Sequence, residues 1–194
     1  MKNYLIAAVL LLASYTSISA ASLDLGHSAG STPYDRYMRP VRQVLGNLEG
    51  DSASMTRVKG LMREGRRFRY TFDNPYTAAY PAETAATRAG DCKDKALWLA
   101  DQMKDENVRF VVGKVTRNAK LSHAWILWQN EGRWWILDCT RLSRPIPADS
   151  VGRNSYVPHY SWAKTGVYRH AATSTGLASV ASKDRAPVAS RGRR

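Results

Sequence analysis

The pattern that most constrains the fold is a helix signal followed by three strand signals in quick succession. Gly90-Asp91 supplies a turn and a helix N-cap, after which apolar residues recur at helical spacing to about residue 104. Three runs of strand-forming residues come next, and the last two flank a tight-turn sequence that predicts an antiparallel hairpin. We therefore expect an α+β fold with this helix packed on an antiparallel sheet. The predicted strands cover 108–116, 121–129 and 133–139.

Weaker patterns flank this core on both sides. Apolar residues at helical spacing predict a helix over 34–48, and a second helix from an N-cap at Asp51 and Ser52 to near Gly65. Alternation over 66–72 predicts a short extended segment, and 155–170 is expected to add one or two strands. The sequence thus predicts one domain over 34–170, with a helical cap at its N-terminal side.

The two ends of the chain differ from this domain. Residues 1–21 have a positive start, a short apolar run and small residues at a plausible cleavage site, which together predict a signal peptide. The run is shorter than the roughly 20 residues of a membrane span, although an uncleaved anchor stays an alternative. Residues 22–33 are expected to form a flexible arm, and 171–194 a disordered basic tail. We expect an exported protein, periplasmic or secreted, with no transmembrane span after cleavage.

The chain is strongly basic. It has 29 Lys and Arg against 16 Asp and Glu, for a formal net charge of +13. Such a charge favours anionic partners, which outside the cytoplasm means envelope polymers or phospholipid surfaces rather than nucleic acid. The charge is spread along the chain rather than gathered in one stripe, so a solvated surface with a basic tail is the favoured explanation.

Three residues carry the chemistry that the sequence indicates. Cys92 lies at the predicted helix start, and His123 and Asp138 lie on successive predicted strands. A thiol, an imidazole and a carboxylate are the parts of a nucleophile, a base and its orienter. The helix N-terminus, an imidazolium and the neighbouring Lys93 would each favour the reactive thiolate.

The predicted hairpin gives this hypothesis a geometric condition. If Asn130 and Glu131 form a two-residue loop, facing residues have numbers that sum to 261, and His123 lies directly opposite Asp138. A bulge at Gly132 would shift the pairing by one residue and turn Asp138 to the other face of the sheet. The catalytic interpretation therefore depends on the register.

Other interpretations of the same residues remain open. Two cysteines in an exported protein are compatible with a disulfide, but Asp138 and Cys139 point to opposite faces of a regular strand, which favours Cys139 as a buried apolar residue. His123 alone would be a hydrogen-bonded core histidine, and Asp91 and Asp94 would interact with the helix N-terminus. No ligand spacing supports zinc, so we expect no metal and no cofactor.

The motifs around these residues resemble the transglutaminase-like superfamily of papain-type folds, and most closely the bacterial transglutaminase-like cysteine proteinases. The resemblance implies that Cys92 is the nucleophile, His123 the general base and acid, and Asp138 the orienter. It extends from about residue 70 to residue 140. The matching motifs are Pro81-x-Glu83-Thr84, Gly90-Asp91-Cys92-x-Asp94-x-Ala96, His123-Ala124-Trp125 and Trp135-Ile136-Leu137-Asp138.

The sequence departs from the family pattern at two positions. Ala86 stands where papain-like enzymes often carry an amide side chain that helps to hold the oxyanion. The backbone amide of Cys92 is then one oxyanion donor, and Tyr80 is a candidate for the second. Lys93 stands where the calcium-dependent proteinases of the bacterial family carry an acidic residue, which argues against a calcium site.

The resemblance and the residues together predict a cysteine peptidase or amidase that acts on peptides or proteins through a thioester acyl-enzyme. A protein transamidase uses the same triad up to the second nucleophile and is the alternative enzyme. A basic envelope-binding module without turnover is the non-enzymatic alternative.

Overall fold

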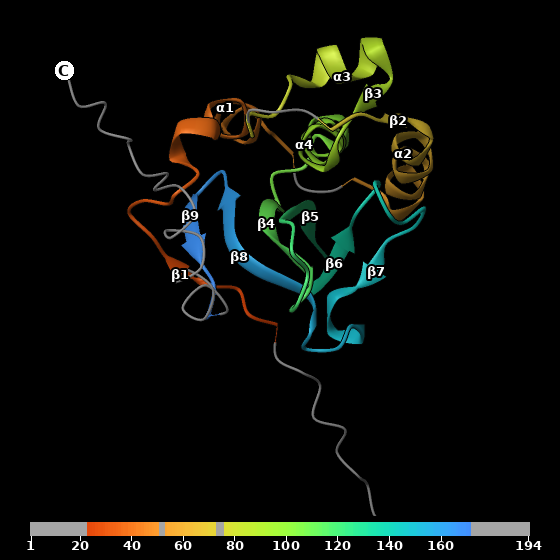
Figure 1. Ribbon diagram of the computed structural model, residues 1–194. Helices are drawn as coiled ribbons and strands as arrows, with labels where there is room; N and C mark the ends of the chain where they lie inside the picture. Colours follow the sequence, from red (N-terminus) through yellow and green to blue (C-terminus); the bar gives the residue numbers. More distant parts are fainter. Residues whose placement is uncertain (1–22, 51–52, 73–75, 172–194) are drawn as a thin grey trace, which may run out of the picture.

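The computed structural model describes residues 23–50, 53–72 and 76–171, and its main feature is a seven-stranded antiparallel sheet (Figure 1). The strand order is β1-β9-β8-β4-β5-β6-β7, so the central strands come from the middle of the sequence and from β8. The strands are β1 (His27–Ser28), β4 (Val108–Thr116), β5 (His123–Asn130), β6 (Arg133–Leu137), β7 (Ile146–Pro147), β8 (Ser155–Ala163) and β9 (Gly166–Arg169).

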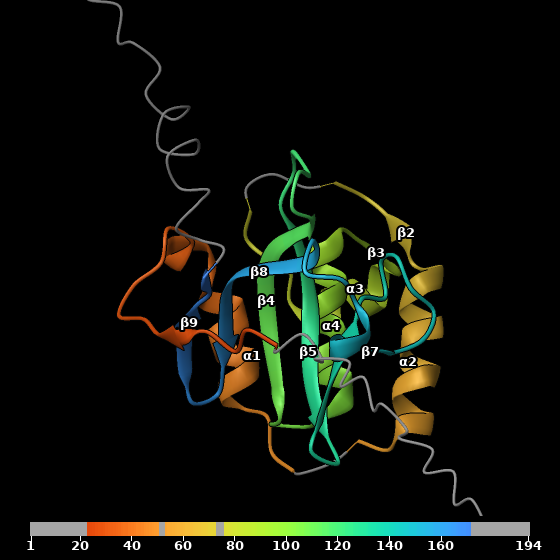
Figure 2. The same cartoon turned by 90° about the horizontal axis from the view of Figure 1, so that it is seen from below.

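Four α-helices cover one face of this sheet, as the two cartoon views show (Figures 1 and 2). A second, two-stranded parallel sheet lies among the helices and pairs β2 with β3. None of the described helices is long and apolar enough to cross a membrane. The remaining elements are η1 (Asp35–Tyr37), α1 (Arg39–Gly46), α2 (Met55–Arg67), β2 (Arg69–Tyr70), α3 (Pro81–Thr87), β3 (Ala89–Gly90), α4 (Cys92–Met103) and η2 (Ala148–Ser150).

Helix α4 is the centre of the fold. It packs on the sheet through β4 and β5 and is covered by α1, α2 and α3 (Figure 1). Ala96, Leu99 and Met103, on the predicted apolar face, are buried, and so are Leu97 and Trp98 on its other sides. The sequence predicted the face toward the sheet; burial extends around the helix because a layer of helices lies on its outer side. The expected α+β architecture with this helix on an antiparallel sheet is confirmed.

The N-terminal helices differ in detail from the sequence prediction. The helix expected over 34–48 is divided into η1 and α1, because Pro40 has no amide hydrogen to donate to the preceding turn and is tolerated only near the start of a helix, where it stands in α1. Helix α2 begins after Ser54, whose side chain accepts a hydrogen bond from the Arg57 amide at 3.2 Å. The expected N-cap at 51–52 lies outside the described residues.

Two short elements carried no usable sequence signal. Helix α3 has only 7 residues, too few to show a helical period, and it begins with Pro81. Strand β1 pairs with β9 through His27 opposite Arg169, in a segment expected to be a flexible arm. Two residues are too few to show strand alternation. The predicted signal peptide, and the predicted tail apart from Ala171, lie outside the described residues.

Candidate active site

Cys92 is the first residue of α4 and is 7% exposed. The Asp91 side chain caps this helix by accepting a hydrogen bond from the Lys93 amide at 2.9 Å. The Asp94 side chain accepts one from the Asp91 amide at 2.9 Å, which completes a capping box. The sulfur is thereby held at the positive end of the helix dipole.

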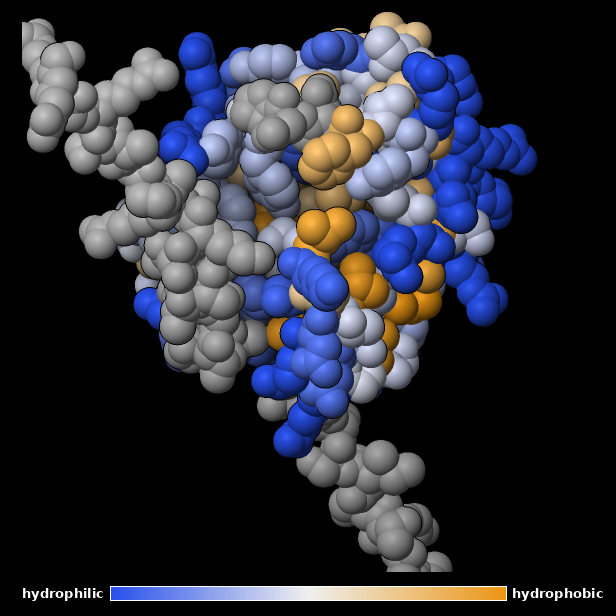
Figure 3. Space-filling view, in the orientation of Figure 1, coloured by the Kyte–Doolittle hydropathy of each residue, from blue (hydrophilic) through white to orange (hydrophobic). Residues whose placement is uncertain are grey.

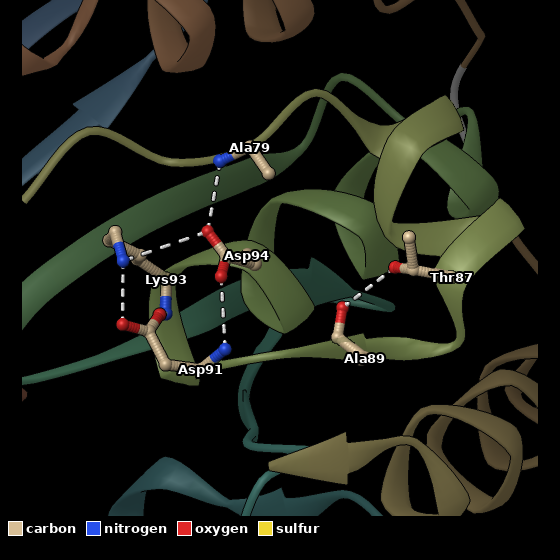
Figure 4. Close-up of polar contacts among 6 residues, drawn as sticks. All are labelled: Ala79, Thr87, Ala89, Asp91, Lys93 and Asp94. Atoms are coloured by element: carbon tan, nitrogen blue, oxygen red, sulfur yellow. Dashed lines mark hydrogen bonds and ion pairs between the residues drawn. The ribbon is translucent and has the colours of Figure 1, made fainter. Parts of the chain in front are cut away.

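A buried charge cluster lies directly beneath this cap (Figure 4). The Lys93 ammonium, on a side chain that is 2% exposed, lies 2.6 Å from Asp91 Oδ2 and 3.8 Å from Asp94 Oδ1. Asp94 Oδ1 also accepts a hydrogen bond from the Ala79 amide at 2.9 Å, which ties the segment before α3 to the start of α4. Burial raises the pKa of Asp94, against the lowering effect of these amides and of Lys93.

The cluster changes the role expected for Lys93. From the sequence, Lys93 was expected to place a positive charge near the Cys92 thiol, whereas its ammonium lies beside the carboxylates of Asp91 and Asp94. Its charge is therefore compensated locally, and it holds the helix start together. Among the described residues, no group of three or more His, Cys, Asp and Glu side chains is arranged to bind a metal ion.

His123 and Asp138 lie together at the end of the hairpin. His123 Nε2 is 2.8 Å from Asp138 Oδ2, and the Asp138 side chain is only 1% exposed. The other carboxylate oxygen, Oδ1, accepts hydrogen bonds from the amides of Thr140 and Arg141 at 3.1 and 3.2 Å. Because Nε2 faces Asp138, Nδ1 is the imidazole nitrogen left for the Cys92 side, and Cys92 lies close enough to help raise the pKa of His123. The structure thus brings all three predicted residues together.

The hairpin register is not the one that the sequence analysis assumed. The pairs are Asn130 with Arg133 and Ile126 with Leu137, so facing residues have numbers that sum to 263 rather than 261. The loop is Glu131-Gly132, and both residues have positive φ values, 51° and 73°, as a two-residue hairpin turn of type I′ requires. The shift is two residues, and a shift of two keeps Asp138 on the same face.

Since the shift keeps Asp138 on the same face of the sheet as His123, their side chains still meet, although the two residues are not a strand pair. His123 and Asp138 do not face each other as a strand pair, because β6 ends at Leu137 and Asp138 lies just past its end. Asp138 also accepts the amides that follow it, which fixes it in a turn. The direct opposition predicted from the sequence was wrong, although the two side chains do meet.

The electrostatic surroundings of His123 favour its cationic form. Burial lowers its pKa, but the hydrogen bonds to Asp138 and Cys92, together with their negative charges, outweigh this and raise the pKa to about 9. The imidazole is therefore protonated at neutral pH. An imidazolium beside a cysteine favours the thiolate, which is the nucleophilic form.

Cys139 stands apart from this arrangement. It is 2% exposed, its Sγ lies 3.5 Å from the Lys95 carbonyl oxygen, and it belongs to the core between α4 and the sheet. Both cysteines are free, so the disulfide alternative is wrong and the prediction of a buried apolar Cys139 is confirmed. Burial raises the pKa of the Cys139 thiol, which keeps it protonated and unreactive.

Sequence reasoning missed Tyr156 and left Tyr80 open. The Tyr156 hydroxyl donates to Asp138 Oδ2 at 2.9 Å from strand β8, which the sequence signals gave no reason to place beside the hairpin end. The Tyr80 hydroxyl donates to Gln43 Oε1 at 3.1 Å, so it is engaged by α1. The positive φ of Tyr156, 49°, is a backbone feature that no sequence pattern predicts.

Comparison with known proteins bears on the fold. No protein-family model matches the chain, and no curated protein matches it. LapG of Legionella pneumophila superposes with a TM-score of 0.51 and 16% identity, over 71% of this chain and 81% of LapG. A second LapG structure, treated with EGTA, gives 0.49 and 17% identity over 68% and 75% of the two chains. The first superposition shows a transglutaminase-like fold, and at this identity it shows the fold alone.

Proposed function

We propose that this chain is an exported cysteine peptidase or amidase of the transglutaminase-like type, with Cys92, His123 and Asp138 as its catalytic residues. The observation that carries the proposal is the 2.8 Å contact between His123 and Asp138 beside a thiol at a helix start. The raised pKa of His123, about 9, adds the charge state that the chemistry needs. The shared fold with LapG, a periplasmic protease, supports the same class of enzyme.

In the proposed first step, the Cys92 thiolate attacks the carbonyl carbon of a peptide or amide bond. The backbone amide of Cys92, at the N-terminus of α4, can donate to the developing oxyanion. The carbon–nitrogen bond then breaks as the His123 imidazolium gives its proton to the leaving amine. The products of this step are a free amine and a thioester on Cys92.

In the second step, a water molecule attacks the thioester while His123 accepts its proton. The carbon–sulfur bond breaks, the acid leaves, and the thiolate and imidazolium are restored. Asp138 stabilises the imidazolium and holds its orientation through the bond to Nε2. A primary amine in place of water would give a transamidase, so we test the two acceptors directly.

The experiment uses the chemistry of the thiol rather than a known substrate. We expect iodoacetamide to alkylate Cys92 selectively, with Cys139 as the internal control because it is buried and protonated. We expect p-nitrophenyl acetate to leave an acetyl group on Cys92 that mass spectrometry detects after rapid acid quenching. Equal alkylation of both cysteines, or no acyl adduct, would contradict the proposal and favour a binding module without turnover.

The choice between hydrolysis and transamidation needs a second assay. A glutamine-rich protein is incubated with the enzyme and a fluorescent primary amine, and both amine incorporation and peptide cleavage are followed. We expect cleavage without incorporation. Incorporation at the expense of cleavage would identify a transamidase.

The basic surface bears on the proposed envelope partners. Helix α2 carries an exposed cationic face (Figure 3, where hydrophilic residues gather on the side of α2). Such a face attracts anionic polymers and lipid surfaces, an effect that salt screens. The cationic residues of α2 are Arg57, Lys59, Arg63, Arg66 and Arg67.

Export is supported by the N-terminal sequence pattern. We expect a secreted form that begins near Ala21 or Ser22, and a secreted form that begins at Met1 would contradict cleavage.

A further inference from the structure

Tyr156 has an unusual backbone for its place in the fold. Its φ is 49°, in the left-handed region that bulky residues rarely adopt, although it lies inside strand β8. The other described non-glycine residues with positive φ have local reasons: Arg88 and Lys104 are helix C-caps, and Glu131 is in the hairpin turn. Tyr156 ends no helix and forms no hairpin turn. A strained conformation of this kind persists where the surrounding contacts demand it.

The hydrogen bond of the Tyr156 hydroxyl group explains this conformation. It donates to Asp138 Oδ2 at 2.9 Å, the same oxygen that His123 Nε2 approaches at 2.8 Å. With the two amides on Oδ1, four donors surround the carboxylate and fix its plane. Tyr156 is the only one of these four donors that comes from outside the hairpin and the turn that follows it. Without it, Oδ2 would be held by His123 alone.

The ring of Tyr156 supports the other half of the pair. It packs edge-on against Trp125, with ring centroids 5.4 Å apart and an interplanar angle of 78°. Trp125 in turn lies stacked beside His123, at 6.3 Å and 22°. One side chain therefore contacts Asp138 through its hydroxyl and reaches the imidazole through an intervening indole. Both parts of the His123–Asp138 pair are braced from β8.

The charged groups around Tyr156 keep its hydroxyl a donor. Burial and the neighbouring Asp138 raise the pKa of Tyr156 well above its usual value, against a smaller lowering effect of Arg141. The phenol is thus neutral wherever His123 titrates. Arg141 is exposed and lines an open groove beside Tyr156, so the phenol connects that groove to the carboxylate.

We propose that Tyr156 is a positioning residue of the Cys92–His123–Asp138 site, which holds the Asp138 carboxylate through its hydroxyl and the His123 ring through Trp125. The catalytic role of Tyr156 rests on the proposed function, whereas the effect of Tyr156 on the pKa of His123 does not. The hydroxyl shares the negative charge of Asp138 with the imidazolium. Its removal leaves that charge to His123 alone and also leaves the carboxylate with one donor fewer.

The test is Tyr156→Phe, which keeps the ring and its packing on Trp125. The matched control is Tyr160→Phe on the same strand, a residue outside the site. Three quantities are measured for each variant: kcat for p-nitrophenyl acetate, the pKa of the His123 imidazole by NMR, and the melting temperature. For Tyr156→Phe we expect kcat to fall about tenfold to hundredfold, the size seen when other hydrogen-bonded supporting residues are removed.

We also expect the pKa of His123 to rise in Tyr156→Phe by about half a unit or more, and neither quantity to change in Tyr160→Phe. A lower melting temperature with unchanged kcat and unchanged His123 titration would overturn the proposal, since a merely structural residue gives that result. The NMR titration needs no turnover. If wild type forms no acyl-enzyme but the titration still shifts, the proposed function fails and the positioning role stands.

Discussion

The two sides of the candidate site are built in different ways. Cys92 is held by residues next to it in the sequence: the capping box and the ion pairs of Asp91, Lys93 and Asp94 all lie within one helical turn. Asp138 accepts the amides of the turn that follows it, but its side-chain partners come from other strands: His123, and Tyr156, 18 residues beyond Asp138. The proposed nucleophile therefore depends on a local motif, and the proposed base depends on how the strands pair.

This difference leads us to expect different failures on the two sides. A change in the charge cluster should damage the folding of the helix start, because removal of one charge of a buried ion pair leaves the opposite charge uncompensated. A change near the hairpin end should spare the fold and disturb the protonation and orientation of His123.

The largest effect is expected for Cys92→Ala. Loss of the nucleophile should lower turnover by about 10⁴-fold or more, with a melting temperature close to that of wild type, because the capping box and the ion pairs that hold the helix start do not involve the Cys92 side chain. Activity is followed by release of p-nitrophenol, and stability by thermal unfolding. His123→Ala should give a loss of similar size, since nucleophile and base act as a unit. Substantial turnover in either variant would contradict the assignment.

Asp138→Asn should lower turnover by about 10³- to 10⁴-fold while side-chain size is preserved. An amide can donate a hydrogen bond to Nε2, which would place the proton on the wrong imidazole nitrogen. The NMR signal of His123 should report the altered tautomer. A variant with wild-type activity would mean that Asp138 supports the fold alone, and the comparison between the two sides would then lose its functional meaning.

The largest effect on stability is expected for Lys93→Met, on the nucleophile side. The substitution leaves two buried carboxylates without their ammonium partner and should lower the free energy of unfolding by about 3–5 kcal/mol. The matched control is Lys104→Met at the other end of α4, whose ion pair with Asp101 is exposed and worth about 1 kcal/mol or less. Urea unfolding measures both. Equal losses in the two variants would show that the buried cluster has no special role.

The sequence predicted the nucleophile side well because its determinants are local. Gly90-Asp91 predicted the turn and the N-cap, and the apolar spacing after Cys92 predicted a helix to about residue 104, one residue past its end at Met103. The burial of Lys93 was not predictable in the same way. A lysine in a first helical turn is ordinarily solvated, whereas the Lys93 side chain is buried with its ammonium beside Asp91 and Asp94.

The base side was predicted in outline only, because a register and a distant partner have weak sequence signals. The strands were expected at nearly the right places, although β6 ends at Leu137, two residues before its predicted end. Asn130-Glu131 and Glu131-Gly132 are both acceptable as hairpin loops. The choice between them moved the pairing by two residues. The contact of Tyr156 with Asp138 depends on how β8 lies beside β4, with a register shift at Gly113, and no local pattern encodes that.

The pH dependence of stability should also separate the two sides. The pKa of His123 is raised from 6.5 to about 9 in the folded protein. The stabilisation that the His123 imidazolium gives the folded protein is therefore complete below about pH 6.5 and is lost as the pH rises through about 9. It amounts to at most about 3 kcal/mol of the free energy of unfolding. Urea unfolding at pH 6 and pH 9.5 should show a larger loss for wild type than for His123→Gln. Equal losses would mean that the Asp138 contact does not favour the imidazolium.

The smallest effect is expected for Cys139→Ser, which lies between the two sides and belongs to neither. The hydroxyl would be buried among apolar side chains of the core with the Lys95 carbonyl oxygen as its nearby acceptor, so we expect a loss of about 1–2 kcal/mol. Alkylation of Cys92 should be unchanged, because the thiol of Cys139 takes no part in the site. Cys139→Ala separates loss of the sulfur from burial of a hydroxyl. If wild-type Cys92 were alkylated only after addition of a reductant, and Cys139→Ser removed that requirement, the two cysteines would form a disulfide in solution and Cys92 would not be a free nucleophile.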